Sequence, residues 1–176
     1  MQIRMIDKKD FPIVDKLIRK SFEHTEHGYD NESELVDKIR ASNAYIPSLE
    51  MVAVDDSDSI VGHGLLSEVS VIDSNKFSHV GLVLAPLDVA INHRNKGIGS
   101  KILTTLEKEA KRMHYRFISI LGHPNYYPRF GYVPAIEYNI HAPFDVPNEV
   151  FMIKPLYDNA LDSISGTIKY SKAFEG

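Results

Sequence analysis

The stretch from His79 to Met113 constrains the fold of this chain more than any other segment. Residues 80–91 form an apolar run rich in Val, Leu and Ile, and a short polar loop, residues 92–96, follows it. The loop ends at Gly97 and Gly99, after which apolar side chains recur at helical spacing. A buried strand, a glycine turn and an amphipathic helix in this order predict half of an α/β unit.

The glycine turn is a predicted anion-binding site. The first N–H groups of a helix have no intrahelical partner, and the helix dipole places about half a positive charge beside them, which favours phosphate. The two glycines let ligand oxygens approach the backbone closely, and two basic side chains add positive charge. The sequence therefore predicts a pyrophosphate site, with an ordinary strand-to-helix turn as the alternative. Its residues are Arg94, Asn95, Lys96, Gly97, Ile98, Gly99 and Ser100.

Three phosphate-binding patterns compete for this loop. A Walker A loop ends in Gly-Lys-Ser/Thr, whereas Gly99 is followed by Ser100 and Lys101 in the wrong order. A dinucleotide fingerprint requires a third glycine at the position of Ile102, so a nucleotide-phosphate binder is disfavoured. The remaining pattern, Arg-x-x-Gly-x-Gly over residues 94–99, resembles the signature of the GNAT family of acyl-CoA-dependent N-acyltransferases. In that family the loop holds the pyrophosphate of coenzyme A.

The composition excludes several other classes of function. The chain has 176 residues, 43% of them hydrophobic, which predicts one globular domain over residues 1–176. A net charge of −4 without a basic run argues against nucleic-acid binding. Because there is no cysteine, acyl transfer has to be direct or use another nucleophile. The N-terminus lacks the apolar core of a signal peptide and no apolar run reaches a membrane span of about 20 residues, so we expect a cytoplasmic enzyme without a membrane partner.

The segments before the central stretch predict two helices and a β-hairpin. Apolar residues at helical spacing indicate a helix over residues 11–22, and a capping pair that begins at Asn31 opens a second helix. The hairpin has strands over residues 50–55 and 60–72. The resemblance implies that the two helices form a wall over the acceptor-amine pocket, so residues 21–45 are the predicted specificity segment.

Isolated polar side chains in these segments have ordinary alternatives. His63 lies between two strand glycines, which suggest a bulge or the close approach of another backbone, and Glu68 follows it. Each side chain either faces a cleft or lies on the solvated face of the strand, and Glu68 is kept as a candidate general base. His24 and His27 are interpreted as loop residues rather than metal ligands, because no third ligand or helix supports them. We expect no metal.

Pro86 predicts an edge or a bulge in the central strand, because proline has no N–H to donate to the ladder. In the family that the loop resembles, a bulge here splays the strand from its neighbour, and exposed backbone amides hold the pantetheine arm and polarise the thioester carbonyl. The resemblance places this role at Leu87, Asp88 and Val89. Asp88 is also a candidate general base, with an ordinary hydrogen-bonded strand residue as the alternative.

A second family feature follows the next predicted strand. The order Tyr127-x-x-x-Gly131-Tyr132 resembles a pattern near the end of GNAT enzymes, in which the first tyrosine donates a proton to the departing thiolate of the coenzyme. Packing of Tyr127 against the last helix is the alternative. An Asn that holds the coenzyme in many members is replaced here by Ile120, which leaves open whether Asn125 takes over this contact.

The resemblance covers nearly the whole chain and extends to a bacterial branch of predicted N-acetyltransferases. It implies a GNAT-like α/β (α+β) fold, a mixed and mostly antiparallel sheet flanked by helices, with the final strands lining the acceptor side. The predicted reaction is direct transfer of an acetyl group from acetyl-CoA to a primary amine of a small molecule or peptide. A non-catalytic acyl-CoA-binding or sensing module is the rival hypothesis. The acceptor, the acyl chain length, the general base and the oligomeric state, including a homodimer, stay open.

Overall fold

The computed structural model describes residues 1–23, 25 and 28–175. Its centre is a mixed sheet whose main path has the strand order β1-β2-β3-β4-β5-β8-β6, while β9 pairs with both β3 and β7. Neighbours along the main path are antiparallel except β4 and β5, which confirms the predicted mixed, mostly antiparallel sheet. The strands are β1 (Gln2–Met5), β2 (Glu50–Val54), β3 (Ile60–Ile72), β4 (Ser78–Val89), β5 (Phe117–Leu121), β6 (Val133–Pro134), β7 (Ile140–His141), β8 (Phe151–Pro155) and β9 (Gly166–Lys169).

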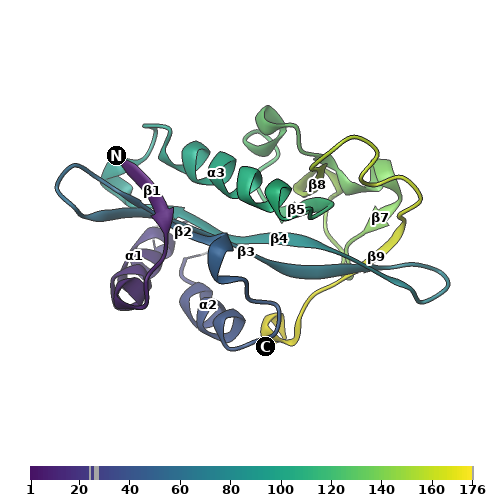
Figure 1. Cartoon of the computed structure of the whole chain (residues 1–176), viewed down its shortest axis with the longest axis horizontal. Helices are drawn as coiled ribbons and strands as arrows, with labels where there is room; N and C mark the ends of the chain where they lie inside the picture. Colours follow the sequence, from purple (N-terminus) through teal and green to yellow (C-terminus); the bar gives the residue numbers. More distant parts are fainter. Residues whose placement is uncertain (24, 26–27, 176) are drawn as a thin grey trace.

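Helices cover both faces of the sheet (Figure 1). α1 (Phe11–Glu23) and α2 (Glu32–Arg40) lie on one face, and α3 (Ile98–Arg112) lies on the other. The three helices agree with the predicted ones. The C-terminal segment returns to the side of α2, so the last residues of the chain lie beside the predicted specificity segment.

The start of α2 differs from the prediction. Asn31 has a left-handed backbone with φ of 63° and makes no side-chain cap bond, so the predicted capping pair is wrong. Glu34 instead accepts hydrogen bonds from the Tyr29 hydroxyl and from Arg19. The loop interpretation of residues 24 and 27 lies outside the described residues.

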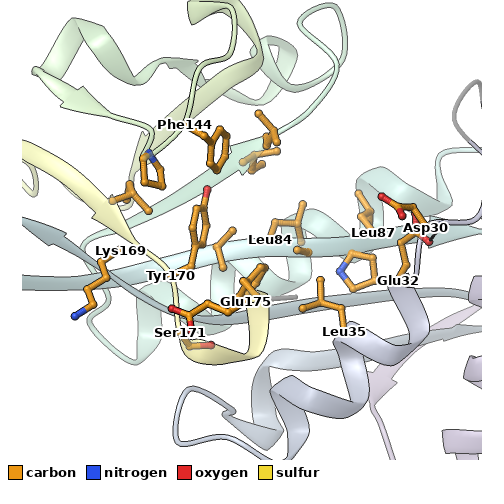
Figure 2. Close-up of a pocket in the computed structure, with 18 of the residues that line it drawn as sticks. Asp30, Glu32, Leu35, Leu84, Leu87, Phe144, Lys169, Tyr170, Ser171 and Glu175 are labelled. Carbon is orange, nitrogen blue, oxygen red and sulfur yellow. Dashed lines mark hydrogen bonds between the residues drawn. The ribbon is translucent and has the colours of Figure 1, made fainter.

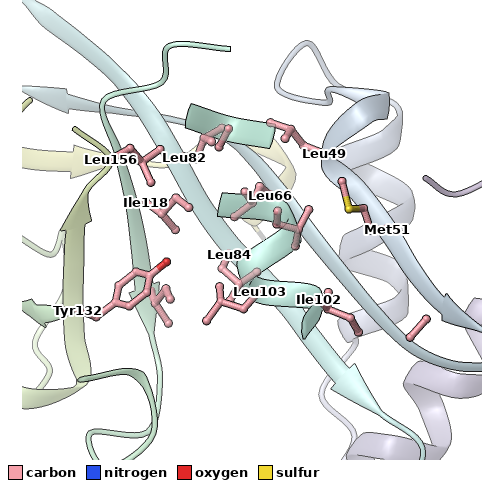
Figure 3. Packing of buried hydrophobic residues seen from close by; sticks show 14 of the residues in the cluster. Leu49, Met51, Leu66, Leu82, Leu84, Ile102, Leu103, Ile118, Tyr132 and Leu156 are labelled. Carbon is pink, nitrogen blue, oxygen red and sulfur yellow. The ribbon is translucent and has the colours of Figure 1, made fainter. Parts of the chain in front are cut away.

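α3 packs directly on β3 because glycines in that strand leave room for its side chains. A Cβ at Gly64 would lie 2.6 Å from Ile102 Cγ2, and one at Gly62 would lie 2.8 Å from Ile102 Cδ1. Ile102, Leu103 and Leu106 are fully buried in the cluster between α3 and the sheet (Figure 3). Each such side chain contributes about 1.5–3 kcal/mol when it leaves water. Of the two predicted explanations for these glycines, the bulge is present, because the register of β3 shifts beside Gly62 against β2 and beside Gly64 against β4. The close approach is made by side chains of α3 and not by another backbone.

The predicted bulge at Pro86 is confirmed. The register of β3 against β4 shifts between Gly64, which pairs with Leu87, and Leu66, which pairs with Leu84. The residues of β4 between these two pairs therefore include one extra residue, and the strand bends there.

β4 and β5 separate after a short parallel pairing. The ladder between them ends where Val83 pairs with Ser119. β5 then continues to Leu121 and pairs on its other side with β8, while β4 continues to Val89. The C-terminal part of β4 therefore borders an opening in the sheet, and this opening positions the site.

Candidate active site

The loop before α3 has the geometry of an anion site. Gly97 has φ of 78°, in the left-handed region that favours glycine. The N–H of Lys101 donates to the C=O of Gly97 at 3.1 Å, which starts the hydrogen-bond ladder of α3. The N–H groups of Ile98, Gly99 and Ser100 precede that ladder and have no acceptor within the helix. They are therefore available to bind an anion at the helix N-terminus.

A cavity of about 630 Å³ joins this loop to the end of β4. The predicted residues Leu87, Asp88 and Val89 line it together with Tyr127. The loop residues 94, 95 and 97–100 line it as well, whereas Lys96 is not among the described lining residues. Lys96 is an exposed residue of the same loop. The structure therefore brings most of the predicted cofactor residues together around one cavity.

The end of β4 presents its backbone to the opening in the sheet. The N–H of Ala90 donates to the C=O of Val61 at 2.8 Å, and Val89 pairs with Gly62. In an antiparallel ladder this pattern makes Val89 and Gly62 a non-hydrogen-bonded pair. The N–H and C=O groups of Val89 therefore face away from β3. Leu87 lies two residues earlier in the same register and has the same orientation. The N–H groups of both residues therefore face the gap between β4 and β5.

Arg94 fastens this region to α1. Its Nη2 donates to the C=O of Ser21 at 2.8 Å, and its Nε donates to the C=O of Val89 at 3.3 Å. The guanidinium thus lies at the C-terminal end of α1, where a cation interacts favourably with the helix dipole. Arg94 contributes positive charge to the cavity and also fixes the distance between α1 and β4.

Tyr127 stands between two cavities and lines both. Its ring packs on Gly122, where a Cβ would lie 2.5 Å from Tyr127 Cε2. Burial raises the pKa of the Tyr127 hydroxyl well above its usual value, so the group stays protonated. Within the part of the chain that the structure describes, this hydroxyl makes no hydrogen bond. A partly buried, protonated donor without a partner among the described residues is suited to a ligand atom.

The sequence analysis missed the neighbouring Tyr126. Its hydroxyl lies 3.1 Å from Ser100 Oγ at the start of α3, and a Cβ at Gly99 would lie 3.2 Å from it. Arg129 lies over the Tyr126 ring at 4.5 Å from its centroid. Tyr126 therefore borders the anion site itself. The sequence did offer an indication, because Tyr126 is adjacent to Tyr127 and a short turn directs consecutive side chains in different directions. One tyrosine could therefore reach the anion site while the other lines the cavity.

The rest of the tyrosine pattern has a structural explanation. Gly131 has φ of 94° and ends the turn that carries Tyr127. Tyr132 is buried and its hydroxyl donates to Glu107 of α3 at 2.9 Å, which also accepts from Lys154 at 2.9 Å. The spacing from Tyr127 to Tyr132 therefore fixes the first tyrosine relative to the helix that forms the anion site.

Asp88 belongs to a buried chain of charged groups. His63 is fully buried, and its Nδ1 lies 3.1 Å from Asp88 Oδ1 while its Nε2 lies 2.8 Å from Glu50 Oε1. Arg40 donates to Glu50 at 2.5 Å and 3.2 Å, and the Tyr45 hydroxyl donates to it at 2.7 Å. Asp88 Oδ2 is buried and has no hydrogen-bond partner among the described residues. His63 thus lies neither on a solvated face nor in the open cleft, but holds Asp88.

These contacts set the protonation states of the buried groups. Burial acts to lower the pKa of His63, but its hydrogen bonds to the two carboxylates outweigh this and raise the pKa to about 9. Burial also opposes ionisation of Glu50, yet His63 and Arg40 lower its pKa to about 2. For Asp88, burial is the larger effect and raises the pKa, while His63 opposes the rise. With His63 as an imidazolium and both carboxylates ionised, the set of Arg40, Glu50, His63 and Asp88 is neutral overall.

Two predicted site residues lie elsewhere. Glu68 accepts a hydrogen bond from the Tyr115 hydroxyl at 2.7 Å and lines a different depression beside Asn43. The backbone N–H of Asn125 bonds to His123 Nδ1 at 3.2 Å, and Asn125 is absent from the described lining of both cavities that Tyr127 borders. Neither Glu68 nor Asn125 is therefore among the described residues that line the two cavities beside Tyr127.

Tyr127 also lines a second cavity, of about 780 Å³, which Figure 2 shows from close by. The predicted specificity segment contributes Phe22, Asp30, Glu32 and Leu35 to it, and β4 contributes its bulge. The C-terminal residues 168–171 and 174–175 complete the wall, which extends the predicted role of the final strands to the tail after β9. Leu87 and Tyr127 line both cavities, so the two spaces meet at the opening between β4 and β5.

The fold and the site together define the class of this protein. Residues 2–135 match the family model described as an acetyltransferase (GNAT) domain, which covers most of the chain. The chain belongs to the GNAT family of acetyltransferases, and the resemblance inferred from the loop and the tyrosine pattern is confirmed. None of the helices that the structure describes combines the length and apolar character of a bilayer-spanning segment.

Particular relatives extend over the whole chain. The uncharacterized N-acetyltransferase YhbS of Escherichia coli K12 is 29% identical over 174 residues, which is 99% of this chain and 98% of YhbS. The crystal structure of Escherichia coli YhbS in complex with CoA matches with a TM-score of 0.88 at 26% identity, over 99% of this chain and 92% of that one. A GNAT family acetyltransferase from Brucella melitensis, in complex with acetyl-CoA, has a TM-score of 0.80 at 22% identity over 99% and 97% of the two chains, and shares the fold.

Proposed function

We propose that this chain transfers an acetyl group from acetyl-CoA directly to a primary amine of a small molecule or peptide. The observation that carries the proposal is the opening between β4 and β5. The anion loop and Tyr127 both border it, and the N–H groups of Leu87 and Val89 face into it. The complexes of YhbS with CoA and of the Brucella melitensis relative with acetyl-CoA support the same co-substrate here.

The residues present fit coenzyme A. Three backbone N–H groups at the start of α3 point at one place, and the glycine at position 99 keeps the space below the Tyr126 hydroxyl free of a side chain. These groups would hold the pyrophosphate, with Arg94 supplying positive charge. Acetyl-CoA supplies the activated thioester, and the extended backbone of Leu87 and Val89 would align its pantetheine arm along β4.

The same backbone groups would stabilise the reaction. When the amine nitrogen attacks the thioester carbon, negative charge develops on the carbonyl oxygen. Fixed N–H donors in a site that excludes water stabilise such charge more strongly than water does, because they need no reorganisation. The bulge at Pro86 is what turns these donors toward the gap, so the strand itself provides this part of the machinery.

Two side chains would then move protons. Tyr127 donates its hydroxyl proton to the sulfur as the carbon–sulfur bond breaks; the burial that raises its pKa also destabilises a thiolate beside it, which favours the transfer. The incoming ammonium loses a proton to Asp88 Oδ2, directly or through water, and the resulting neutral amine attacks the thioester carbon. Asp88 is suited to this because burial raises its pKa toward the working range and His63 fixes its orientation.

The test is made with the full chain. Thermal unfolding with acetyl-CoA, and with ATP and NAD as controls, should give a stabilisation with acetyl-CoA alone, about 2.7 kcal/mol at ~100 times Kd. Release of free thiol with an amine panel then measures turnover. Binding without turnover of any amine would favour the non-catalytic sensing module. No binding of acetyl-CoA would refute the proposal.

Tyr127→Phe tests the acid role. Loss of a general acid typically costs about 10²–10⁴-fold in kcat, while binding of acetyl-CoA should persist because the anion loop is unchanged. Tyr157→Phe, at an exposed tyrosine outside both cavities, is the matched control. A Tyr127→Phe enzyme with the kcat of the unmodified chain would remove Tyr127 from the mechanism.

A further inference from the structure

The cavity beyond Tyr127 has the size and walls of a small-molecule site. Its volume of about 780 Å³ falls within the range of roughly 300–1,000 Å³ that is typical of ligand pockets. Leu84, Pro86 and Leu87 of β4 form one wall, and Leu35 of α2 faces them (Figure 2). The walls are predominantly aliphatic and aromatic, which is unsuited to a polyhydroxylated acceptor whose many polar groups need partners.

One end of the cavity carries an aromatic cluster. The rings of Phe144 and Tyr170 are nearly parallel, at 7° with centroids 6.2 Å apart, and Tyr170 also packs with Phe174 at 5.1 Å. Phe144 remains 45% exposed, and Leu121, which also lines the cavity, remains 49% exposed. Large apolar side chains exposed together around a cavity mark a surface that a ligand covers. An aromatic ring is the group that packs best against such a cluster.

The other end of the cavity is acidic. Figure 2 shows Asp30 and Glu32 next to Leu87, and Lys169 at the end of Phe144 and Tyr170. Leu87 is one of the residues, with Tyr127, that line both cavities. Glu175 lies between them. Within the described chain, the carboxylates of Asp30 and Glu175 make no hydrogen bond or ion pair. The negative potential attracts a cation to the end where the amine has to react.

The polarity of the cavity defines the acceptor. An ammonium group at the end of Asp30 and Glu32 places its nitrogen beside Leu87 and Tyr127, where the two cavities meet. The remainder of the molecule then extends along the aliphatic walls to Phe144 and Tyr170. We propose that the acceptor is an arylalkyl primary amine, a compound with an ammonium group at one end and an aromatic ring at the other. This inference rests on the proposed acetyl transfer.

The experiment compares acceptor classes with the full chain and acetyl-CoA. Phenethylamine and tryptamine represent the proposed class, spermidine the polyamines, glucosamine the amino sugars and an alanyl peptide the peptide N-termini. Thiol release should give kcat/KM values at least about 10-fold higher for the arylalkylamines than for the other acceptors. A higher value for spermidine, glucosamine or the peptide would overturn the inference while leaving the acetyl transfer intact.

Direct binding separates failure of the inference from failure of the proposed function. Calorimetric titration of phenethylamine into the protein, with and without coenzyme A, measures the acceptor site independently of turnover. Phenethylamine binding without any binding of acetyl-CoA would refute the proposed acetyl transfer but would support an arylalkylamine site in the larger cavity. Absence of phenethylamine binding, with coenzyme A bound, would overturn the inference.

Two variants locate the site. Phe144→Ala should raise KM for phenethylamine by about 10-fold and leave kcat nearly unchanged, because the ring contributes binding rather than chemistry. KM for propylamine, which has no ring, should not change in this variant. Phe77→Ala is the matched control, since Phe77 is 66% exposed and lies outside the cavity. An equal rise in KM for propylamine and phenethylamine would contradict packing of the ring at Phe144.

Discussion

The buried imidazolium at His63 predicts a loss of stability between neutral and alkaline pH. The folded state raises the pKa of His63 from its ordinary 6.5 to about 9. The folded protein therefore binds a proton more tightly than the unfolded chain, and the resulting stabilisation is complete below pH 6.5 and lost as pH rises through 9. Each pH unit of this difference is worth about 1.4 kcal/mol, so about 3 kcal/mol should be lost across the window.

Urea unfolding at pH 6.5 and pH 9.5 measures this loss. With a urea slope of about 2 kcal/mol per M, the midpoint should fall by roughly 1.5 M between the two pH values. His63→Gln should lower stability at pH 6.5 by about 3–5 kcal/mol, because it leaves the buried carboxylates of Glu50 and Asp88 without the imidazolium, and the pH dependence in this window should vanish.

His79→Gln is the control, since this histidine also contacts a carboxylate, Asp73, but is partly exposed. It should keep both the stability and the pH dependence of the unmodified chain. If His63→Gln does not fold, the urea midpoints of the unmodified chain at the two pH values still test whether His63 is held as an imidazolium. Equal midpoints at pH 6.5 and 9.5 would show that His63 is not held as an imidazolium.

Other substitutions test the packing around the site. Gly81→Ala should destabilise the chain by about 1–3 kcal/mol or more, measured by urea unfolding, because its Cβ would lie 2.3 Å from the Phe117 ring; unchanged stability would refute this contact. Gly99→Ala should weaken acetyl-CoA binding by about 10-fold in calorimetry at unchanged Tm, because the new methyl group enters the anion site beside the Tyr126 hydroxyl. An unaltered Kd would mean that the pyrophosphate lies elsewhere. Asp88→Asn should lower kcat most at the pH values where Asp88 is ionised, and it should remove the fall in kcat toward acidic pH, because protonation of this base causes that fall; a pH profile of unchanged shape would exclude Asp88 as the general base.

Much of the fold follows from local patterns in the sequence. The apolar spacing after Gly99 predicts α3, the hairpin over residues 50–72 predicts β2 and β3, and Pro86 predicts the bulge in β4. Each of these features depends on the residues of one segment and its immediate neighbours. The wrong capping pair at Asn31 shows where local patterns fail. Whether Glu34 accepts a hydrogen bond from a backbone N–H or from the Tyr29 hydroxyl depends on tertiary packing, which the local sequence does not specify.

The site is only partly visible in the sequence. The anion loop and Tyr127 belong to contiguous patterns, so they were predictable. The connection of His63 to both Glu50 and Asp88 requires three strands in a defined register, which no local pattern provides. Glu68 was a reasonable candidate by residue type, but the same register places it beside Tyr115 instead.

The C-terminal wall of the larger cavity has a practical consequence for handling the protein. Tyr170, Phe174 and Glu175 line that cavity, so a peptide fused at the C-terminal end would follow closely on residues of the cavity wall. A purification tag at that end would compete with small ligands for the cavity. A charged tag would also change the electrostatic potential that we expect to select an amine. The amino group of Met1, by contrast, is ion-paired with Asp56 in the turn between β2 and β3, outside both cavities. Tags and immobilisation linkers therefore belong at the N-terminus.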